Sequence, residues 1–227
     1  MPNYRRAFSP GGTFFFTVVT YRRTRLFDKP EFRALLRNVI QRVRRNYPFS
    51  IDAWVLLPEH LHCIWTLPQG DADFSKRWSL IKSGFSRQAK AIQYPMEPIS
   101  PSRQKHRESA FWQRRFWEHL IRDDADFEAH IDYIHFNPVK HGWVNRAEDW
   151  PHSTIHRNIK KGFHPENWAL EASKGGQNPA TDRHYWHGFH RDFAHHAMPE
   201  ITGHGGQNAD ANRVHVTPRR HFAHPTF

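Results

Sequence analysis

Residues 49–67, FSIDAWVLLPEHLHCIWTL, contain two apolar and β-branched runs that are separated by a Pro-Glu pair. Runs of this length and composition, bounded by turn-forming residues, predict β-strands. We therefore expect one strand over residues 49–57, a tight connection at Pro58 and Glu59, and a second strand over residues 60–67. These two strands are the beginning of a sheet, and the other elements must cover its apolar side chains.

Two elements precede this pair. Residues 13–20, TFFFTVVT, are aromatic and β-branched and predict another strand. In residues 30–46 the apolar side chains recur at intervals of three and four, which predicts a helix with an arginine-rich polar face.

Four elements follow it. We expect a helix from an Asp73 N-cap to Ala89, a proline-rich loop over residues 93–104, and a strand over residues 111–121. The Asp123-Asp124 pair then caps a helix that ends near Asn137-Pro138. The order β, α, β, β, α, β, α predicts an α+β fold of the ferredoxin-like kind, an antiparallel sheet with helices on one face.

The chain divides by composition at about residue 162. Residues 1–162 carry all of these elements and are expected to form one folded domain. Residues 163–227 are rich in His, Gly, Pro and Asn and have no apolar period, so we expect a largely disordered tail.

The charge indicates a polyanionic partner. Among 227 residues, 33 Lys and Arg oppose 22 Asp and Glu, for a net charge of +11. Residues 1–45 carry eleven of the basic residues, interleaved with aromatic side chains that can stack on unpaired bases. The single cysteine, Cys63, excludes an intramolecular disulfide framework and fits a reducing cytosol, and no apolar run is long enough to span a membrane.

Two histidines share one face of the predicted strand over residues 60–67. Because strand side chains alternate, His60 and His62 point to one side and Leu61 and Cys63 to the other. Two imidazoles about 7 Å apart along a strand can bind one divalent metal ion. No His-Glu-x-x-His motif and no second cysteine are present, which argues against a zinc-peptidase or structural zinc site. Taken alone, the pair is equally compatible with two surface histidines.

The last predicted helix carries a phenol and an amide one turn apart. Its apolar Phe127, Ile131 and Ile134 form the expected core stripe. Tyr133 and Asn137 lie together beside that stripe, on a more exposed face. Without further context they would be interpreted as surface residues.

Together, two segments resemble a known family. They are PEHLH, residues 58–62, and YIHFNPVKHG, residues 133–142. The sequence resembles the single-tyrosine HUH transposases of the IS200/IS605 kind, in particular the REP-associated tyrosine transposases. The resemblance covers roughly residues 4–150 and implies an HUH endonuclease fold.

The resemblance implies a tyrosine nuclease that cuts and rejoins single-stranded DNA. It makes Tyr133 the nucleophile that forms a 5′-phosphotyrosine bond, and His60, His62 and Asn137 the ligands of Mg²⁺ or Mn²⁺. Because a phenol with a pKa near 10 is a weak nucleophile, such assistance is chemically required. His130 and Lys140 are secondary candidates for phosphate contact or proton transfer.

The expected substrate is repetitive palindromic (REP-type) hairpin DNA with unpaired flanks. The basic and aromatic residues that we expect to bind it are Tyr4, Arg5, Arg6, Arg22, Arg23 and Arg25, with the arginine-rich helix face as a further surface. The expected location is cytoplasmic and nucleoid-associated, as a monomer or a homodimer. Two alternatives remain: a non-catalytic nucleic-acid-binding module, and a nuclease in which metal-activated water replaces the tyrosine.

Overall fold

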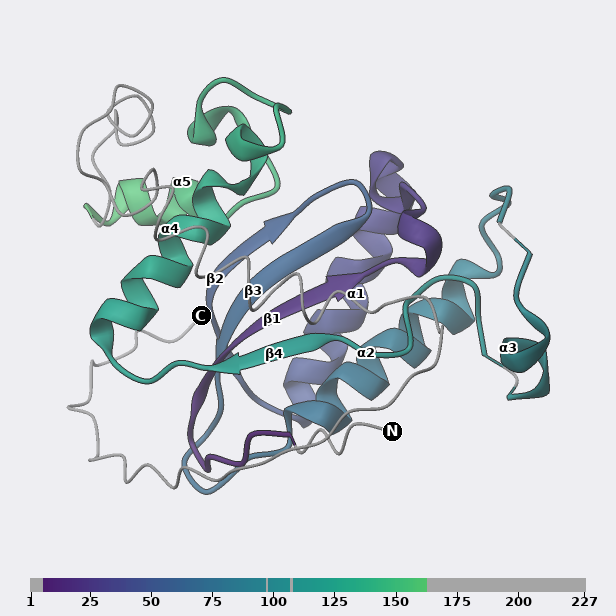
Figure 1. The fold of residues 1–227 in the computed structure, drawn as a ribbon, viewed down its shortest axis with the longest axis horizontal. Coiled ribbons are helices and arrows are strands. Elements are labelled where there is room, and N and C mark those ends of the chain that lie inside the picture. Colours follow the sequence, from purple (N-terminus) through teal and green to yellow (C-terminus); the bar gives the residue numbers. More distant parts are fainter. Residues whose placement is uncertain (1–5, 97, 107, 163–227) are drawn as a thin grey trace, which may run out of the picture.

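Four antiparallel strands form the centre of the protein (Figure 1). The computed structural model describes residues 6–96, 98–106 and 108–162. The strands are β1 (Thr13–Val19), β2 (Ser50–Leu56), β3 (His60–Thr66) and β4 (Trp117–Leu120), in the order β2-β3-β1-β4. β3 pairs with both β1 and β2, and β4 pairs with β1. The predicted α+β class and the predicted hairpin are therefore confirmed.

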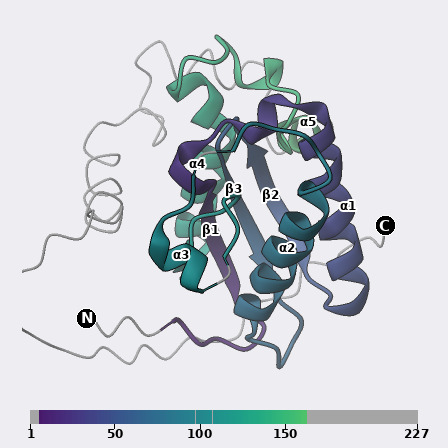
Figure 2. The ribbon, with the colours of Figure 1, turned by 90° about the vertical axis from the view of Figure 1, so that its right-hand side faces the viewer.

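Helices cover both faces of this sheet, and not one face as the sequence analysis expects. α1 (Pro30–Asn46) and α2 (Phe74–Ala89) lie on one side, and α4 (Asp124–Lys140) lies on the other (Figure 2). The reason is visible in β1, where Phe14 and Phe16 pack with α1 and α2 while Phe15 packs with Tyr133 and Ile134 of α4. A strand that is apolar on both faces needs cover on both.

The helix ends follow their predicted signals. α1 has the predicted bounds. Asp73 caps α2 by accepting a hydrogen bond from the Lys76 backbone N–H, and Asp123 caps α4 in the same way through the Asp126 N–H. α4 continues past Asn137-Pro138 to Lys140, and Gly142 follows with φ +69°. A residue in this left-handed conformation commonly ends a helix.

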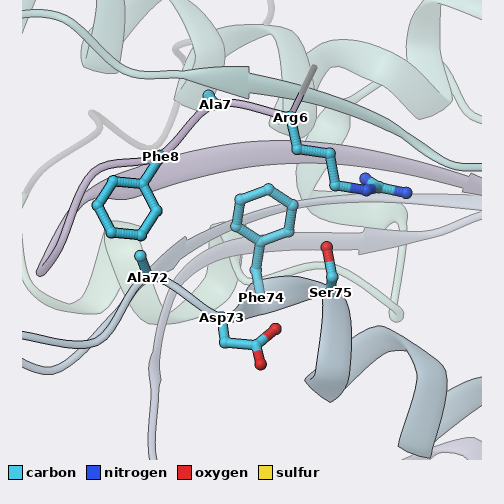
Figure 3. Close-up of a pocket in the computed structure, with 7 residues that line it drawn as sticks. All are labelled: Arg6, Ala7, Phe8, Ala72, Asp73, Phe74 and Ser75. Atoms are coloured by element: carbon cyan, nitrogen blue, oxygen red, sulfur yellow. The ribbon is translucent and has the colours of Figure 1, made fainter. Parts of the chain in front are cut away.

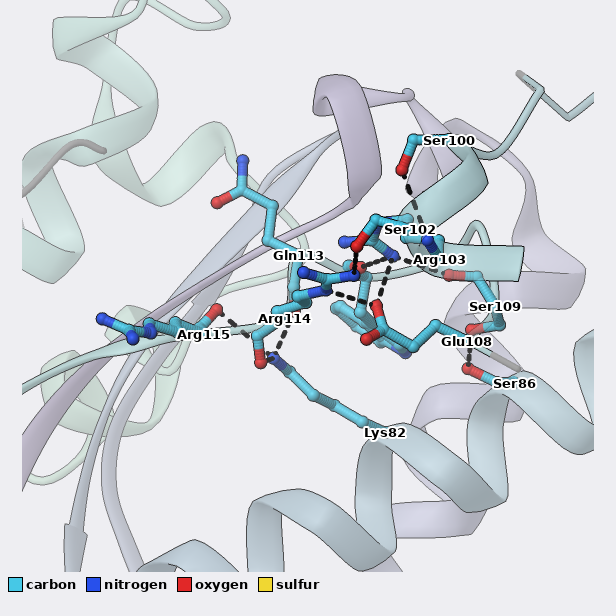
Figure 4. Close-up of polar contacts among 11 residues, drawn as sticks. Lys82, Ser86, Ser100, Ser102, Arg103, Glu108, Ser109, Gln113, Arg114 and Arg115 are labelled. Carbon is cyan, nitrogen blue, oxygen red and sulfur yellow. Dashed lines mark hydrogen bonds and ion pairs between the residues drawn. The ribbon is translucent and has the colours of Figure 1, made fainter. Parts of the chain in front are cut away.

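The strand predicted over residues 111–121 is confined to β4. The preceding segment uses its carbonyl groups for side-chain contacts: Lys82 Nζ donates a hydrogen bond to the Gln113 carbonyl at 2.8 Å and also contacts the next two carbonyls (Figure 4). Burial of Lys82 lowers its pKa to about 7. Carbonyls that bind a lysine in this way do not form a strand ladder.

A short helix, α3 (Pro101–Lys105), lies within the predicted loop over residues 93–104. Ser100 caps it by accepting from the Arg103 N–H, and Arg103 donates to the carbonyls of Ser109 and Trp112 (Figure 4). This segment therefore packs against the start of the segment that leads into β4, through contacts that have no sequence period.

The chain after α4 covers the exposed edge of β2. Val55 and Ser153 form an isolated antiparallel bridge, and the Leu56 N–H donates to the His152 carbonyl at 2.9 Å. The following helix, α5 (Ile155–Lys160), places Arg157 against the Ile51 carbonyl. The sequence analysis does not predict this edge cover, and its predicted tail, residues 163–227, lies outside the described residues.

Three short 3₁₀ helices complete the described chain, at Tyr21–Arg23, Leu26–Asp28 and Ala147–Asp149. The first two follow β1, and the first carries Arg22 and Arg23, while Arg25 lies between the two. Among the described residues, no helix is both long and apolar enough to cross a membrane.

Candidate active site

The two histidines of β3 and the tyrosine of α4 meet between the sheet and α4. The Tyr133 ring centre lies 5.0 Å from that of His62, and the His60 ring centre lies 4.9 Å from His62. All three side chains are buried, with Tyr133 only 5% exposed. Two sequence segments about seventy residues apart are thus brought together, and Cys63 lies in the opposite core as predicted.

A polar neighbour contacts the Nδ1 atom of each histidine. Thr17 Oγ1 lies 2.9 Å from His62 Nδ1, and Glu59 Oε1 lies 2.9 Å from His60 Nδ1. Such outer contacts fix the orientation of a metal-binding imidazole and leave its other nitrogen for coordination. In both rings, Nε2 is therefore the nitrogen suited to bind a metal ion.

The electrostatic environment keeps His62 neutral. Burial holds the pKa of His62 well below its usual value, and the neighbouring His60 and His141 act in the same direction. A metal ion binds the neutral imidazole, so this environment leaves no proton for the metal to displace. Burial acts to raise the pKa of the Glu59 carboxyl, but its hydrogen bond with His60 and the charges of His60 and Arg23 together outweigh burial and lower the pKa.

Tyr133 is a phenol that needs help to ionise. Burial raises its pKa to about 12, although nearby Asn137 and Arg23 oppose the rise. Lys140 Nζ lies 5.2 Å from the Tyr133 ring centre, and burial lowers the pKa of this amine to about 8. The Lys140 amine, which titrates near neutral pH, therefore lies next to the Tyr133 phenol, which does not.

Asn137 is completely buried, and both polar atoms of its side chain lack a hydrogen-bond partner within the described part of the chain. Its amide is near enough to Tyr133 to affect the phenol, but not in the geometry of a hydrogen bond. A buried amide without partners is costly and rare. An oxygen donor left open next to Tyr133, whose ring contacts His62, fits a hard divalent cation, so these side chains pass a test of fit to the expected metal.

The orientation of α4 differs from the expected one. Tyr133 and Asn137 face the sheet and are buried, whereas Phe127 and Ile131 are only partly buried and Ile134 is fully buried. The side of the helix that was expected to be more exposed is the one that points at His62, because the sheet presents histidines and Phe15 there.

Basic side chains lie at the histidine end of this site. Arg23 Nη1 lies 3.3 Å from Glu59 Oε1, and the His141 ring centre lies 5.6 Å from that of His60. Arg22 and Arg25 follow the same strand and are exposed. His141 and Glu59 were not selected as site residues from the sequence, although each lies within a quoted motif. Tyr4 and Arg5 lie outside the described residues.

Arg6 lies elsewhere. Its guanidinium is 4.1 Å from the Phe116 ring centre and pairs with Glu118 at 2.8 Å. It lines a pocket with Phe8 and Phe74 at the N-terminus of α2 (Figure 3). Phe74 belongs to the core on the opposite side of the sheet from Tyr133. The structure thus separates Arg6 from Arg22, Arg23 and Arg25.

A second cluster, which we name the His119–Asp126–His130 cluster, lies one to two turns before Tyr133. Potential ligand atoms of the three side chains lie within 4.8 Å of one another. Asp126 accepts from His119 at 2.9 Å and from the Arg122 backbone at 3.0 Å, and His130 Nδ1 lies 3.1 Å from its other oxygen. The cluster joins β4 to α4. Of its members the sequence analysis selected only His130.

The family of the chain follows from comparison with known proteins. The family described as "Transposase IS200 like" matches residues 13–137, from the first residue of β1 to Asn137. The chain belongs to the IS200-like transposase family. The match spans the four strands, the histidine pair, Tyr133 and Asn137, whereas Lys140 and His141 lie just beyond it.

Individual members are also similar. The REP-associated tyrosine transposase of Escherichia coli (strain K12) is 46% identical over 169 residues, which is 74% of this chain and 92% of the relative. A relative from Haemophilus influenzae is 43% identical over 168 residues, 74% of this chain and 93% of its own. A solved structure of a REP-associated tyrosine transposase bound to a REP hairpin has a TM-score of 0.60 and 46% identity, covering 74% of this chain and 91% of that one.

Proposed function

We propose that this IS200-like transposase is a metal-dependent enzyme that cuts and rejoins single-stranded DNA through a covalent bond to Tyr133. The observation that carries the proposal is the meeting of Tyr133, the histidine pair and an unpartnered buried amide in one site. A phenol, two imidazoles and an amide oxygen supply a nucleophile and a ligand set, which a binding module would not need.

His60, His62 and Asn137 would hold the metal, with Mg²⁺ or Mn²⁺ suited to mixed nitrogen and oxygen ligands. When bound, the ion would polarise the scissile phosphate and stabilise negative charge on it. Thr17 and Glu59 hold the two rings through Nδ1, so the ligand set is oriented before DNA arrives.

In the reaction, the Tyr133 oxygen attacks phosphorus and the bond from phosphorus to the 3′-oxygen breaks. The products are a 5′-phosphotyrosine and a free 3′-hydroxyl, and the phosphodiester energy is retained for rejoining. We assign the proton to Lys140: its neutral amine accepts the phenol proton, and the resulting ammonium returns a proton to the departing 3′-oxygen. The lowered pKa of Lys140 supports this assignment.

The DNA would enter over the basic edge formed by Arg22, Arg23 and Arg25, next to the Tyr133 site. The substrate class follows from the relative whose solved structure is bound to a REP hairpin. We therefore propose hairpin DNA of the REP type with unpaired flanks as the substrate. Its phosphates would pair with these exposed guanidinium groups, of which Arg23 also contacts Glu59 and Arg25 also contacts Asp28.

The test is covalent trapping with DNA labelled at one end only. A strand with a 3′-terminal label should migrate with the denatured protein when Mg²⁺ or Mn²⁺ is present, whereas a 5′-terminal label should be released on a fragment with a free 3′-hydroxyl. Tyr133→Phe should abolish the covalent band and retain DNA binding.

Tyr47→Phe is the matched control, because Tyr47 also lies under a lysine, with Lys76 Nζ 4.5 Å from its ring centre. It should retain full activity. Cleavage with a free 5′-phosphate and an active Tyr133→Phe variant would instead indicate a nuclease that uses water. No cleavage under any divalent metal, with binding intact, would indicate a binding module.

A further inference from the structure

Trp143 is an exposed aromatic side chain beside the Tyr133 site. Within the described ranges, Phe8 and Trp143 are the two large hydrophobic side chains that are exposed, and Trp143 is 38% exposed. Phe8 lies at the pocket near the N-terminus of α2, on the far side of the sheet. Trp143 therefore needs its own explanation.

The position of Trp143 is fixed relative to the reacting residues. Its N–H donates to the Pro138 carbonyl at 2.9 Å, which ties it to the last turn of α4 directly after Asn137. Behind it, the ring of Trp150 has its centre 6.3 Å away and is held by a hydrogen bond from its indole N–H to the Leu56 carbonyl. An exposed indole on a rigid support loses little conformational entropy when a ligand stacks on it.

A cation lies against this ring. The Arg25 guanidinium lies 4.7 Å from the Trp143 ring centre and is oriented by Asp28, whose carboxylate accepts from Arg25 Nε at 2.8 Å. Arg25 follows Arg23, which pairs with Glu59 beside His60. One half of the Arg25–Trp143 pair is thus attached to the histidine side of the site, and the other half to the tyrosine side.

We infer that the Arg25–Trp143 pair is a stacking position for one unpaired nucleobase next to the scissile phosphate. This inference rests on the proposed function and adds a position that reads the DNA strand there. Aromatic rings and guanidinium planes both stack on bases, and every base offers a face to them. The surrounding charge is positive, from Arg22, Arg23 and Lys140, as the flanking phosphates require.

The test is a cycle between one protein change and one DNA change. Binding is measured in the Tyr133→Phe background, where no cleavage occurs, on a hairpin oligonucleotide whose unpaired nucleotides are made abasic one at a time. With Trp143 present, one abasic position should weaken binding about tenfold, the scale of one lost base stack. With Trp143→Leu, the same abasic position should have no further effect.

Trp143→Phe should restore most of the abasic penalty, because it keeps an aromatic face. Phe8→Ala is the control for an exposed aromatic, and it should leave the penalty at that position unchanged. The inference is wrong if Trp143→Leu weakens binding equally for intact and abasic DNA at every position, since the residue then acts only on the fold. Failure of the proposed function is distinguishable, because it removes the covalent band of the unmodified enzyme and leaves this binding cycle readable.

Discussion

Asn137 provides a prediction in which stability and activity move in opposite directions. We expect Asn137→Leu to stabilise the metal-free protein and to abolish covalent adduct formation. The side chain is completely buried and neither amide atom has a hydrogen-bond partner in the described structure. Leucine has the same branched shape and number of side-chain heavy atoms, buries no polar atom and favours the helix more than asparagine does.

The expected size follows from the unmade hydrogen bonds. An unsatisfied buried polar group costs about 1–3 kcal/mol, so removing the amide should raise the free energy of unfolding by about 2 kcal/mol. For a protein of this size, that corresponds to an increase in Tm of about 4–8 °C. The measurement is thermal or urea unfolding in EDTA, followed by the same experiment with Mn²⁺, which should stabilise the unmodified protein and not the variant.

Asn137→Asp is the companion variant. A carboxylate keeps an oxygen ligand but places a charge at a buried position, so the metal-free variant should be destabilised and Mn²⁺ should restore its stability. The reasoning would be refuted if Asn137→Leu destabilised the metal-free protein by more than about 1 kcal/mol, which would mean that the amide is satisfied in the folded state. Retained adduct formation would refute its assignment as a ligand.

Three further predictions concern protons and salt. With a Lys140 pKa of about 8, the rate of adduct formation should rise as the pH passes through that value, and Lys140→Arg, which keeps the charge but cannot accept a proton, should remove that rise and slow the reaction. Burial alone would raise the pKa of Asp126, but its hydrogen bonds with His119 and His130 hold it below its usual value, so its stabilisation is present above about pH 4 and lost below. Asp126→Asn should therefore flatten the fall of the unfolding free energy at acid pH. At neutral pH it should lower that free energy by about 2 kcal/mol, less than for a fully buried pair because Arg122 is exposed. An unchanged fall at acid pH would show that the Asp126 carboxylate is not its cause. Arg23→Ala should reduce the slope of log affinity against log salt by about one. Lys160→Ala, a change at an exposed position of α5, should not. Equal slopes for the two variants would contradict the proposed path of the DNA over Arg23.

The parts of the site that follow from strand and helix periodicity could be predicted from the sequence. Strand alternation places His60 and His62 on one face and Cys63 on the other, and helical spacing places Tyr133 beside Asn137. That the histidine pair and the Tyr133–Asn137 pair form one site is predicted by the resemblance to a family, and not by the strand and helix periodicities. No local pattern says which side of α4 faces the sheet, because that side carries polar residues where a core helix would carry apolar ones.

The remaining differences come from contacts between distant residues. Lys82 binds the carbonyls that would otherwise continue β4, and nothing in the composition of residues 111–121 reveals a lysine thirty positions earlier. β1 is covered on both faces because Phe14 and Phe16 point to one side and Phe15 to the other. The apolar run alone does not predict this, because it also fits a strand with only one buried face in a larger protein. His141 and Glu59 lie within the two quoted motifs, and only the fold shows that their side chains contact the His60 ring.

The cover over the edge of β2 determines how far the chain can be shortened. The family match ends at Asn137, yet the segment whose backbone pairs with β2, residues 152–154, comes after that residue. A fragment that stopped at Asn137 would keep the histidines and the tyrosine, but it would also present a bare strand edge with unpaired N–H and C=O groups. Such an edge pairs with strands of other molecules, so this fragment would tend to self-associate. A recombinant fragment that remains monodisperse should therefore extend at least to Gly162.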